Sequence, residues 1–353
     1  MKYKIVKFQT RKNSPKATIL LIYTGGTIGM LYDDSGSLVP FNFGHIMDRI
    51  SYLRGFDINI TVISFPEPID SSSIQLEHWN DLAYIIFENY DSYDGFVVLH
   101  GTDTMAYSAS ALSFMLEGLN KPVIFTGAQL PIGAARSDAR ENLITALDIA
   151  SSKDGEKPVV SEVCIYFSYL LLRGNRSKKV ESSHFNAFES ENYPSLAEAG
   201  VDIEYDYSAL GAYRKDARLS YKKILDTNVA ILKVFPGMTP GVVENILSIR
   251  GLKGVVLETY GSGTVTADPW IADYLKNAIK NNIIMFNVSQ CTGGRVMQGR
   301  YQTSKMLADI GVVSGSDITT EAAITKMMYL LSNEDSIKKV KERLKIPLCG
   351  EMS

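Results

Sequence analysis

Short apolar runs alternate with segments of helical periodicity along most of the chain. Four of the runs have the composition of buried strands and end in turn residues: residues 18–23, 95–100, 122–125 and 163–167. Apolar positions recur at helical spacing in residues 105–119 and 137–151. Strands that alternate with helices in this way predict a parallel sheet with helices on both faces.

A second series of the same kind follows a polar, tyrosine-rich segment. Residues 189–221 show little periodicity, and we expect them to connect two domains. Downstream, the runs VAILKVF, GVVLETY and NIIMFNV alternate with helices, two of which are predicted to start at Thr239-Pro240 and Asp268-Pro269, where the first residue of each pair caps the helix. A helix near residues 321–331 follows. The last predicted helix is amphipathic, with three apolar residues facing inward: Ile337, Val340 and Leu344.

This pattern predicts an α/β protein of two domains, as the length of 353 residues also favours. The larger N-terminal α/β domain, residues 1–195, is expected to hold a mostly parallel sheet with helices on both faces. Residues 196–225 are the predicted linker. A smaller C-terminal α/β domain is predicted for residues 226–353.

Composition and charge narrow the function classes. The 36 Lys and Arg against 39 Asp and Glu leave a net charge of −3, so no nucleic-acid partner is expected. No apolar run is long enough for a membrane span, and the N-terminus lacks the features of a signal peptide, so we expect no membrane association. Three widely spaced cysteines fit reduced thiols better than disulfides and favour a cytoplasmic location.

Metal and cofactor motifs are absent from the sequence. The four histidines form no HExxH pair and no CxxC is found, which predicts no metal site and no cofactor. His100, at the end of an apolar run, is interpreted as a structural residue with satisfied hydrogen bonds rather than a base.

The stretch ILLIYTGGTIGM contains the first candidate site. It matches neither GxxxxGK[ST] nor GxGxxG, so a nucleotide-binding loop is disfavoured. The glycines can form a tight turn in which Thr27 has a structural role. Alternatively, they let a substrate approach the backbone while Thr27 presents its hydroxyl group at the end of the strand. The loop alone leaves both readings open.

A second loop, HGTDT, places Thr102 and Asp103 after another buried strand, although Asp103 alone could cap the following helix. Carboxyl ends of parallel strands lie at one edge of a sheet, so both threonines are expected in one crevice. A threonine hydroxyl needs a base, and RGNRSKK offers Lys178 or Lys179, between which spacing does not choose. In a Thr–Lys–Asp relay, Asp103 orients a neutral lysine that deprotonates Thr102, and backbone N–H groups stabilise the oxyanion. This chemistry suits amide hydrolysis.

Together these stretches resemble the bacterial L-asparaginase family, and within it the cytoplasmic type I branch. The motifs that carry the resemblance run in order from about Thr18 to the C-terminal helix: IYTGGTIGM, DGFVVLHGTDTMAYSASALSFMLE, NKPVIFTGAQLP with RSDARENL, RGNRSKK, and SQC followed by TEAAITK. The resemblance implies the two-domain α/β fold and hydrolysis of L-asparagine to aspartate and ammonia without a metal. It also implies a homodimer or homotetramer with sites completed near subunit contacts.

The resemblance assigns roles to residues of this chain. It implies that Thr27 is the nucleophile, and that the relay consists of Thr102, Asp103 and Lys179. The substrate's α-amino and α-carboxylate groups would be held by the segment that starts at Asp70, with Ser71 and Ser72 as contacts, although a serine cluster is also typical of an ordinary turn. The backbone carbonyl of Ala128 would face the amide group.

Three departures from the family pattern affect the site. The family's activating tyrosine, about ten residues after the first threonine, is replaced by Ser37. We expect Tyr301 to supply the phenol, with Tyr32 as the alternative; Tyr301 could also be only an interface aromatic. Thr264 stands where the family commonly has asparagine, which weakens any contribution of a neighbouring subunit.

The third departure concerns regulation. Some type I enzymes are activated by asparagine at a second site built from Thr, Arg and Cys, and this chain has Lys178, Glu258 and Cys291 there. Glu258 reverses the charge that a carboxylate needs, so no such activation is expected.

Three other functions compete with asparagine hydrolysis. Glutamine is one methylene longer, a difference that a pocket distinguishes by only about 1–3 kcal/mol, so a mixed glutaminase-asparaginase is an alternative. An amino-acid-sensing protein on an asparaginase scaffold is favoured by Ser37 and Thr264 but opposed by the complete Thr–Lys–Asp set. An archaeal-type tRNA-dependent amidotransferase subunit would carry an extra N-terminal domain, and the pattern here starts close to the N-terminus.

Overall fold

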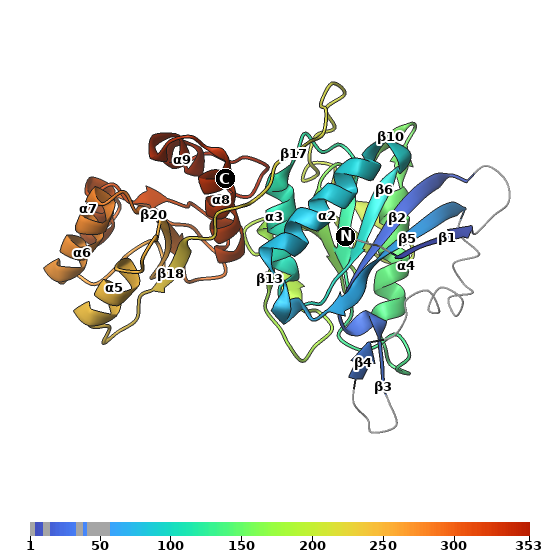
Figure 1. Ribbon diagram of the computed structural model, residues 1–353, viewed down its shortest axis with the longest axis horizontal. Helices are drawn as coiled ribbons and strands as arrows, with labels where there is room; N and C mark the ends of the chain where they lie inside the picture. The colour runs from blue at the N-terminus through green and yellow to red at the C-terminus, as the bar shows by residue number, and fades with distance from the viewer. Residues whose placement is uncertain (1–3, 10–14, 33–37, 41–56) are drawn as a thin grey trace. The chain divides into compact units, whose positions relative to one another are not determined.

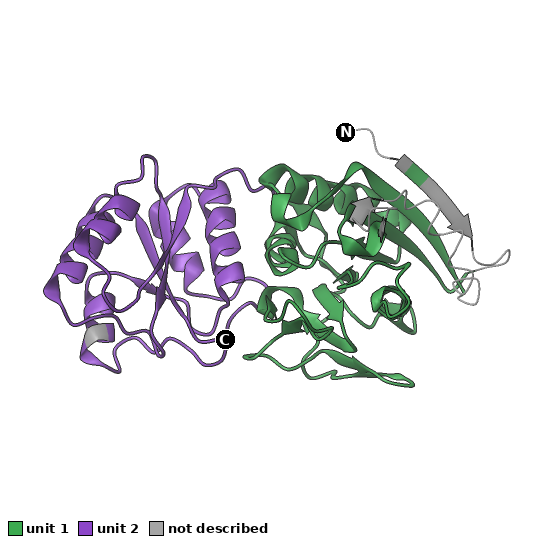
Figure 2. Ribbon diagram, turned by 90° about the horizontal axis from the view of Figure 1, so that it is seen from below, with its two compact units in different colours: residues 1–221 green, residues 222–353 purple. Residues whose placement is uncertain are grey.

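The computed structural model describes residues 4–9, 15–32, 38–40 and 57–353. The chain divides into two compact units, residues 1–221 and 222–353 (Figure 2). Ser37 lies outside the described residues. Among the described residues, no helix is both long and apolar enough to cross a lipid bilayer.

The first unit is built on a nine-stranded sheet in the order β1-β5-β2-β6-β8-β11-β12-β15-β16. The five central strands are parallel: β5 (Ile58–Ile69), β2 (Ala17–Gly25), β6 (Gly95–Leu99), β8 (Val123–Thr126) and β11 (Val163–Phe167). Antiparallel strands extend both edges: β1 (Lys4–Gln9), β12 (Leu170–Arg173), β15 (Ala197–Ala199) and β16 (Ile203–Tyr205). The exits of all five parallel strands therefore lie at one edge.

Helices cover both faces of this sheet, as the sequence pattern predicts. Leu143 and Leu147 of α4 (Ala139–Ser151) pack in one core cluster with strand residues such as Leu21 and Val97. In Figure 1, α2 (Leu76–Asn89) and α3 (Met105–Met115) lie on the opposite side of the sheet from α4. The mixed α/β class and the large, mostly parallel N-terminal sheet are confirmed.

Short elements complete the first unit. Three pairs of short strands join neighbouring segments: β3 (Met30–Tyr32) with β4 (Leu38–Pro40), β9 (Lys153–Asp154) with β10 (Lys157–Pro158), and β13 (Lys178–Lys179) with β14 (Phe188–Glu189). Single turns of 3₁₀ geometry in the described residues include η1 (Thr27–Gly29), η3 (Ser71–Ser73), η4 (Tyr90–Ser92) and η5 (Gly174–Arg176). Two of them, η1 and η3, directly follow the parallel strands β2 and β5.

Two elements of this unit differ from the predictions. The helix expected over residues 105–119 ends at Met115, because β7 (Leu116–Glu117) pairs with β17 (Ser220–Tyr221). Residues 189–221, expected as a connection, contribute β15 and β16 to the large sheet. These strands span only three residues each at the sheet's edge, too short to show the alternation on which a strand prediction depends.

The second unit is a smaller parallel sheet in the order β18-β19-β20-β21. Its strands are β18 (Val229–Lys233), β19 (Gly254–Thr259), β20 (Ile284–Ser289) and β21 (Val313–Ser314). Its helices are α5 (Pro240–Leu247), α6 (Pro269–Lys280), α7 (Gln302–Asp309), α8 (Thr320–Asn333) and α9 (Ile337–Leu344). The predicted smaller C-terminal α/β unit is thereby confirmed.

At the helix ends of the second unit, the structure differs from two of the sequence-based predictions. Thr239 and Asp268 occupy the N-cap positions of α5 and α6, but neither side chain makes a capping hydrogen bond. In α9, Val340 and Leu344 are buried as expected, whereas Ile337 is 37% exposed. Ile337 is the first residue of that helix, where the core no longer covers the apolar stripe.

A buried ion pair ties the segment after α9 to α8. Lys326 Nζ lies 2.6 Å from Glu351 Oε1, and both side chains are 0% exposed. The ammonium also donates to the carbonyl of Ile346 (2.7 Å), and the carboxylate accepts the N–H groups of Leu348 and Cys349. Burial lowers the pKa of Lys326, and the carboxylate of Glu351 opposes that shift. The pair thus satisfies both of its charges and several backbone groups.

None of the three cysteines, all of which lie in described residues, forms a disulfide, and their environments differ. Cys164 is buried in β11, whereas Cys291 and Cys349 are exposed. Burial raises the pKa of the Cys164 thiol well above its usual value. Because the thiolate is the reactive form, Cys164 is inert in the folded chain.

Candidate functional site

The loops that follow the parallel strands are packed against one another through glycines. A Cβ atom on Gly25 would lie 2.2 Å from the carbonyl oxygen of Ile69, at the end of β5, and one on Gly26 would lie 2.6 Å from the backbone N of Gly101, after β6. Both glycines also have positive φ, at 141° and 86°, which L side chains rarely adopt. A Cβ on Gly127, after β8, would lie 2.4 Å from the carbonyl oxygen of His100. The exits of β2, β6 and β8 therefore meet, as expected, and that of β5, a strand that the sequence did not predict, joins them.

Thr27 is the first residue of η1, directly after these glycines, and is half-buried. The phenol of Tyr23 lies beneath the turn and donates to the carbonyl of Gly29 at 3.4 Å. Burial raises the pKa of Tyr23 to about 12, so this phenol keeps its proton. Sequence analysis missed Tyr23 as a support of the Thr27 turn, because it reads as one more apolar residue of the strand.

The structure brings Thr102, Asp103 and Lys179 together. Lys179 Nζ lies 2.8 Å from Thr102 Oγ1 and 2.7 Å from Asp103 Oδ1. Thr102 is buried, and the Lys179 side chain is only 18% exposed. Lys178 precedes it in β13, and successive strand residues point to opposite faces, so the geometry selects Lys179 where spacing left two lysines open.

Asp103 is not used as a helix cap, the alternative that the sequence allows. Thr104 is the N-cap residue of α3, and its hydroxyl donates to the carbonyl of Ser71 at 2.7 Å. The carboxylate of Asp103 instead pairs with Lys179. Asp103 therefore holds the amine beside Thr102, which is the geometry that the relay requires.

The serine segment after β5 lies next to the Thr102 loop. Asp70 is exposed and accepts the N–H of Ser72 at 3.0 Å, so it caps η3. Ser71 is buried, and its hydroxyl oxygen lies 2.5 Å from the position that a Cβ atom on Gly101 would occupy. Ser72 is exposed. This segment thus combines a turn held by Asp70 with one hydroxyl group, that of Ser71, beside the Thr102 loop.

Ala128 and Gln129 follow β8, and Gln129 contacts the same loop. Ala128 is buried, and Gln129 Oε1 lies 3.4 Å from Thr102 Oγ1. The amide nitrogen of Gln129 donates to the carbonyl of His184 at 2.9 Å. Gln129, which sequence analysis did not single out, links Thr102 to the segment that follows Lys179. Its only sequence signal is its position next to Ala128.

His100 forms the end of a hydrogen-bonded chain inside the first unit. Its Nδ1 lies 2.7 Å from the carbonyl of Gly101, which can only accept, so Nδ1 carries the hydrogen. Nε2 then accepts from the hydroxyl of Ser108 (2.9 Å), whose oxygen accepts from Trp79 Nε1 (2.9 Å). Burial lowers the pKa of His100 to about 4, and the charge of His78 adds to this. His100 is therefore a neutral residue with both ring nitrogens satisfied, consistent with the structural role expected of it.

This burial predicts a pH-dependent stability. In the unfolded chain His100 is protonated as the pH falls below its ordinary pKa of about 6.5, whereas in the folded chain it stays neutral until about pH 4. The free energy of unfolding therefore decreases as the pH falls from about 6.5 to about 4. Between pH 7 and pH 5 the linkage amounts to about 2 kcal/mol. Denaturant unfolding of the wild type and of His100→Gln at both pH values measures it, with exposed His184→Gln as the control. An equal loss in wild type and His100→Gln would contradict the assignment.

The remaining predicted positions belong to other parts of the chain. Tyr301, in the second unit, is the N-cap residue of α7 and is 51% exposed. Tyr32 is the last residue of β3. Thr264 forms an isolated bridge with Tyr260. Within the described residues, no group of three or more His, Cys, Asp and Glu side chains is placed to hold a metal ion.

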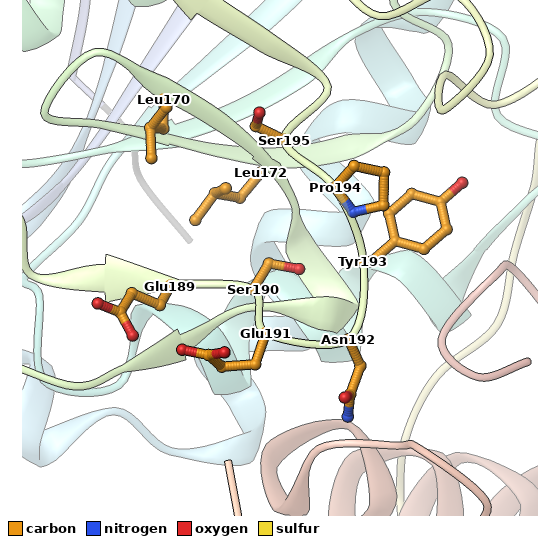
Figure 3. A pocket seen from close by; sticks show the side chains of 9 residues that line it. All are labelled: Leu170, Leu172, Glu189, Ser190, Glu191, Asn192, Tyr193, Pro194 and Ser195. Carbon is orange, nitrogen blue, oxygen red and sulfur yellow. The ribbon is translucent and has the colours of Figure 1, made fainter. Parts of the chain in front are cut away.

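A hollow of about 480 Å³ lies elsewhere on the first unit (Figure 3). It is lined by Leu170, Leu172, Glu189, Ser190, Glu191, Asn192, Tyr193, Pro194 and Ser195. The carboxyl groups of Glu189 and Glu191 lie side by side, and a hydrogen bond between them raises the pKa of Glu189. No predicted site residue lines this hollow.

Known proteins share both units of this chain. The family model described as asparaginase, N-terminal, matches residues 18–210, and that of the glutaminase/asparaginase C-terminal domain matches residues 228–344. L-asparaginase 1 of Escherichia coli is 38% identical over 96% of this chain and 98% of its own length. The crystal structure of L-asparaginase I from Vibrio cholerae superposes with a TM-score of 0.86 at 37% identity, covering 96% of this chain and 99% of that one. The probable cytoplasmic L-asparaginase from Campylobacter jejuni gives a TM-score of 0.79 at 25% identity, covering 93% and 99%.

Proposed function

The chain belongs to the asparaginase family, and from this premise we propose that it hydrolyses L-asparagine to L-aspartate and ammonia. The observation that carries the proposal is the position of Lys179, whose amine contacts both the Thr102 hydroxyl and the Asp103 carboxylate. A hydroxyl group activated by an adjacent base that a third group orients is the arrangement that nucleophilic amide hydrolysis needs.

In the proposed reaction, Thr27 is the nucleophile and Thr102, Lys179 and Asp103 relay the proton. The hydroxyl oxygen of Thr27 attacks the side-chain amide carbon, and its proton passes through the relay to the leaving amide nitrogen. The C–N bond breaks and ammonia leaves, and water then hydrolyses the acyl-threonine ester to aspartate. Lys179 acts as a base here only in its unprotonated form. Asp103 keeps the amine in place throughout.

Substrate binding is proposed for the two neighbouring loops. The segment of Asp70, Ser71 and Ser72 would hold the α-amino and α-carboxylate groups, and the η3 turn supports this role because it places the Ser71 hydroxyl beside the Thr102 loop. The backbone carbonyl of Ala128 would accept a hydrogen bond from the substrate's amide NH₂ group. Orientation from both ends would place the amide carbon in line for attack.

We also propose a cytoplasmic, homodimeric or homotetrameric enzyme that needs no cofactor or metal and binds neither nucleic acid nor membrane. The free cysteines and the similarity to a protein described as a probable cytoplasmic L-asparaginase support the location. The proposed catalytic residues other than Tyr301 lie in the first unit, which supports an N-terminal catalytic domain and a smaller C-terminal domain, whereas most of the predicted linker, residues 196–225, belongs to the first unit.

Ammonia release from asparagine and from glutamine tests the function directly. We expect turnover of asparagine, with a hyperbolic dependence on its concentration. Glu258 supports the absence of activation, because its carboxylate already accepts from Thr320 Oγ1 at 2.6 Å and lies 3.5 Å from Lys233 Nζ. Binding of asparagine without ammonia release would favour the sensing function, equal turnover of glutamine would favour the mixed activity, and a sigmoidal response would contradict the prediction on Glu258.

The source of the activating phenol is a separate prediction. We expect Tyr301→Phe to lower kcat by about 10²- to 10³-fold, because a group that assists proton transfer typically contributes about 10²- to 10⁴-fold. Tyr32→Phe is the matched variant and should keep near wild-type turnover. Loss of activity in Tyr32→Phe, with normal turnover in Tyr301→Phe, would assign the activating phenol to Tyr32. Full activity of both variants would leave Tyr301 as an interface aromatic.

A further inference from the structure

Side chains of the first turn of α4 hold the backbone of the loop that contains Ala128. The carboxylate of Asp138 accepts the N–H of Gln129, at 2.9 Å from Oδ2, and that of Leu130, at 3.1 Å from Oδ1. The amide of Asn142, which is 1% exposed, donates to the carbonyl of Gly127 at 3.0 Å. The backbone groups on both sides of Ala128 are thereby fixed by one helix end.

The same asparagine also reaches a second strand exit. Asn142 Oδ1 accepts the N–H of Ser168, the first residue after β11, at 3.2 Å. Asn142 Nδ2 lies 3.3 Å from Asp138 Oδ2, so the two side chains form one unit. Because the backbone at Ser168 has a positive φ of 46°, the bond helps to hold a conformation that a serine rarely adopts. The exits of β8 and β11 are thus joined through α4.

The side chain of Asp138 does not cap its own helix, although aspartate usually does so at this position. It is the N-cap residue of α4, where a carboxylate normally accepts N–H groups of its own helix, yet its side chain makes no capping bond. Ser137 serves the helix instead, because its hydroxyl oxygen accepts the N–H of Ala139 at 3.0 Å. The carboxylate is directed back to the Ala128 loop. Helix capping therefore does not explain this residue.

The carbonyl of Ala128 itself is left available. In the described parts of the chain, the groups that bond to Gly127, Gln129 and Leu130 place no donor on the Ala128 carbonyl oxygen. The fixed backbone also carries Gln129, whose side chain lies against Thr102. We propose that Asp138 and Asn142 are positioning residues that aim the Ala128 carbonyl at the scissile amide of the substrate, an inference that rests on the proposed function.

The consequence of positioning is a selective loss of turnover. The Ala128 carbonyl acts at the reacting end of the substrate, whereas the segment from Asp70 to Ser72 acts at the other end. Displacing the carbonyl should therefore disturb the attack geometry more than binding, and a shift of about 1 Å in such a group can cost about 100-fold in rate. A residue that only stabilises α4 would instead lower the amount of folded enzyme and leave kcat per folded molecule unchanged.

Asp138→Ser separates these roles, because serine suits a helix N-cap as well as aspartate does but is too short to keep both loop bonds. We expect kcat for asparagine to fall roughly 10- to 100-fold while KM stays within about threefold. Glu141→Gln is the matched control: it removes a negative charge from the same helix turn at an exposed residue, and kcat should stay within about twofold. Unchanged kcat in Asp138→Ser, or an equal loss in Glu141→Gln, would overturn the proposal.

Asn142→Asp is the second variant, because it keeps the acceptor for Ser168 but removes the donor to Gly127. It should give the same kcat-selective loss, and a thermal midpoint that falls with unchanged kcat per folded molecule would overturn the proposal. Amide hydrogen exchange gives a readout that does not need activity. The N–H groups of Gln129 and Leu130 should exchange faster in Asp138→Ser than in the wild type, and unchanged exchange would refute the holding role. An inactive wild type with this faster exchange would refute the proposed function alone.

Discussion

Replacing Lys179 with methionine is expected to lower kcat for L-asparagine by about 10³-fold, within the range for removal of a catalytic base. Methionine keeps much of the length and the apolar stem of lysine but has no amine to exchange a proton with Thr102. The substitution also leaves Asp103 without its partner at 2.7 Å, but that carboxylate is 62% exposed and stays hydrated. The fold should therefore persist. Steady-state ammonia release, with circular dichroism to verify folding, measures the effect.

Lys178→Met is the matched control for this experiment. Lys178 is the neighbouring residue in β13 and lies opposite Glu189 of β14 in the strand register, so its replacement removes the same charge from the same short strand. We expect kcat to stay within about threefold of the wild type, because the side chain points away from Thr102. Comparable losses in the two variants would assign the effect to the strand or its charge and would contradict the relay.

Glu351→Gln is expected to produce a large loss of stability, about 3–5 kcal/mol, without changing any residue of the proposed catalytic loops. The substitution leaves the ammonium of Lys326 buried with no compensating charge, because both side chains are fully enclosed. Carbonyl oxygens of the C-terminal segment still accept from it, but they do not neutralise it. Denaturant unfolding followed by a probe of the second unit measures the change.

The exposed pair Lys339–Asp335 provides the comparison. Its atoms are as close, at 2.8 Å, but the side chains are 55% and 74% exposed. Solvent screens such pairs, so Lys339→Met should change the unfolding free energy little. Replacing both Lys326 and Glu351 with methionine should recover much of the loss, because no charge is then left buried. If Glu351→Gln were no more destabilising than Lys339→Met, the buried pair would have no role in stability.

Apolar runs identified the interior of both sheets, because strands buried on both faces need continuous apolar sequence. The four N-terminal runs correspond to β2, β6, β8 and β11. The strand β5 had no counterpart among the predicted elements, although it is the longest. Its sequence, INITVISFPEPI, contains two prolines and ends in the polar stretch PEP, and the strand lies between β2, to which it is parallel, and the antiparallel edge strand β1. Such pairing is a property of the whole sheet.

The candidate site was predictable where side chains carry the chemistry and less so where they support it. Thr102 and Asp103 stand out as polar residues directly after a buried strand, and geometry then selected Lys179. Gln129, Asp138 and Asn142 act through backbone N–H and carbonyl groups of another loop. Bonds of that kind leave no residue-type pattern, so only the folded chain reveals them.

Because one cysteine is buried and two are exposed, the reactivity of the thiols can be used to follow unfolding of the chain. An alkylating reagent at neutral pH should label Cys291 and Cys349 at once, whereas Cys164 becomes reactive only when β11 leaves the sheet. Mass spectrometry that counts labels over time would then follow opening of the first unit without any introduced probe. The same label count, taken in the presence of asparagine, would show whether an occupied site holds that sheet closed.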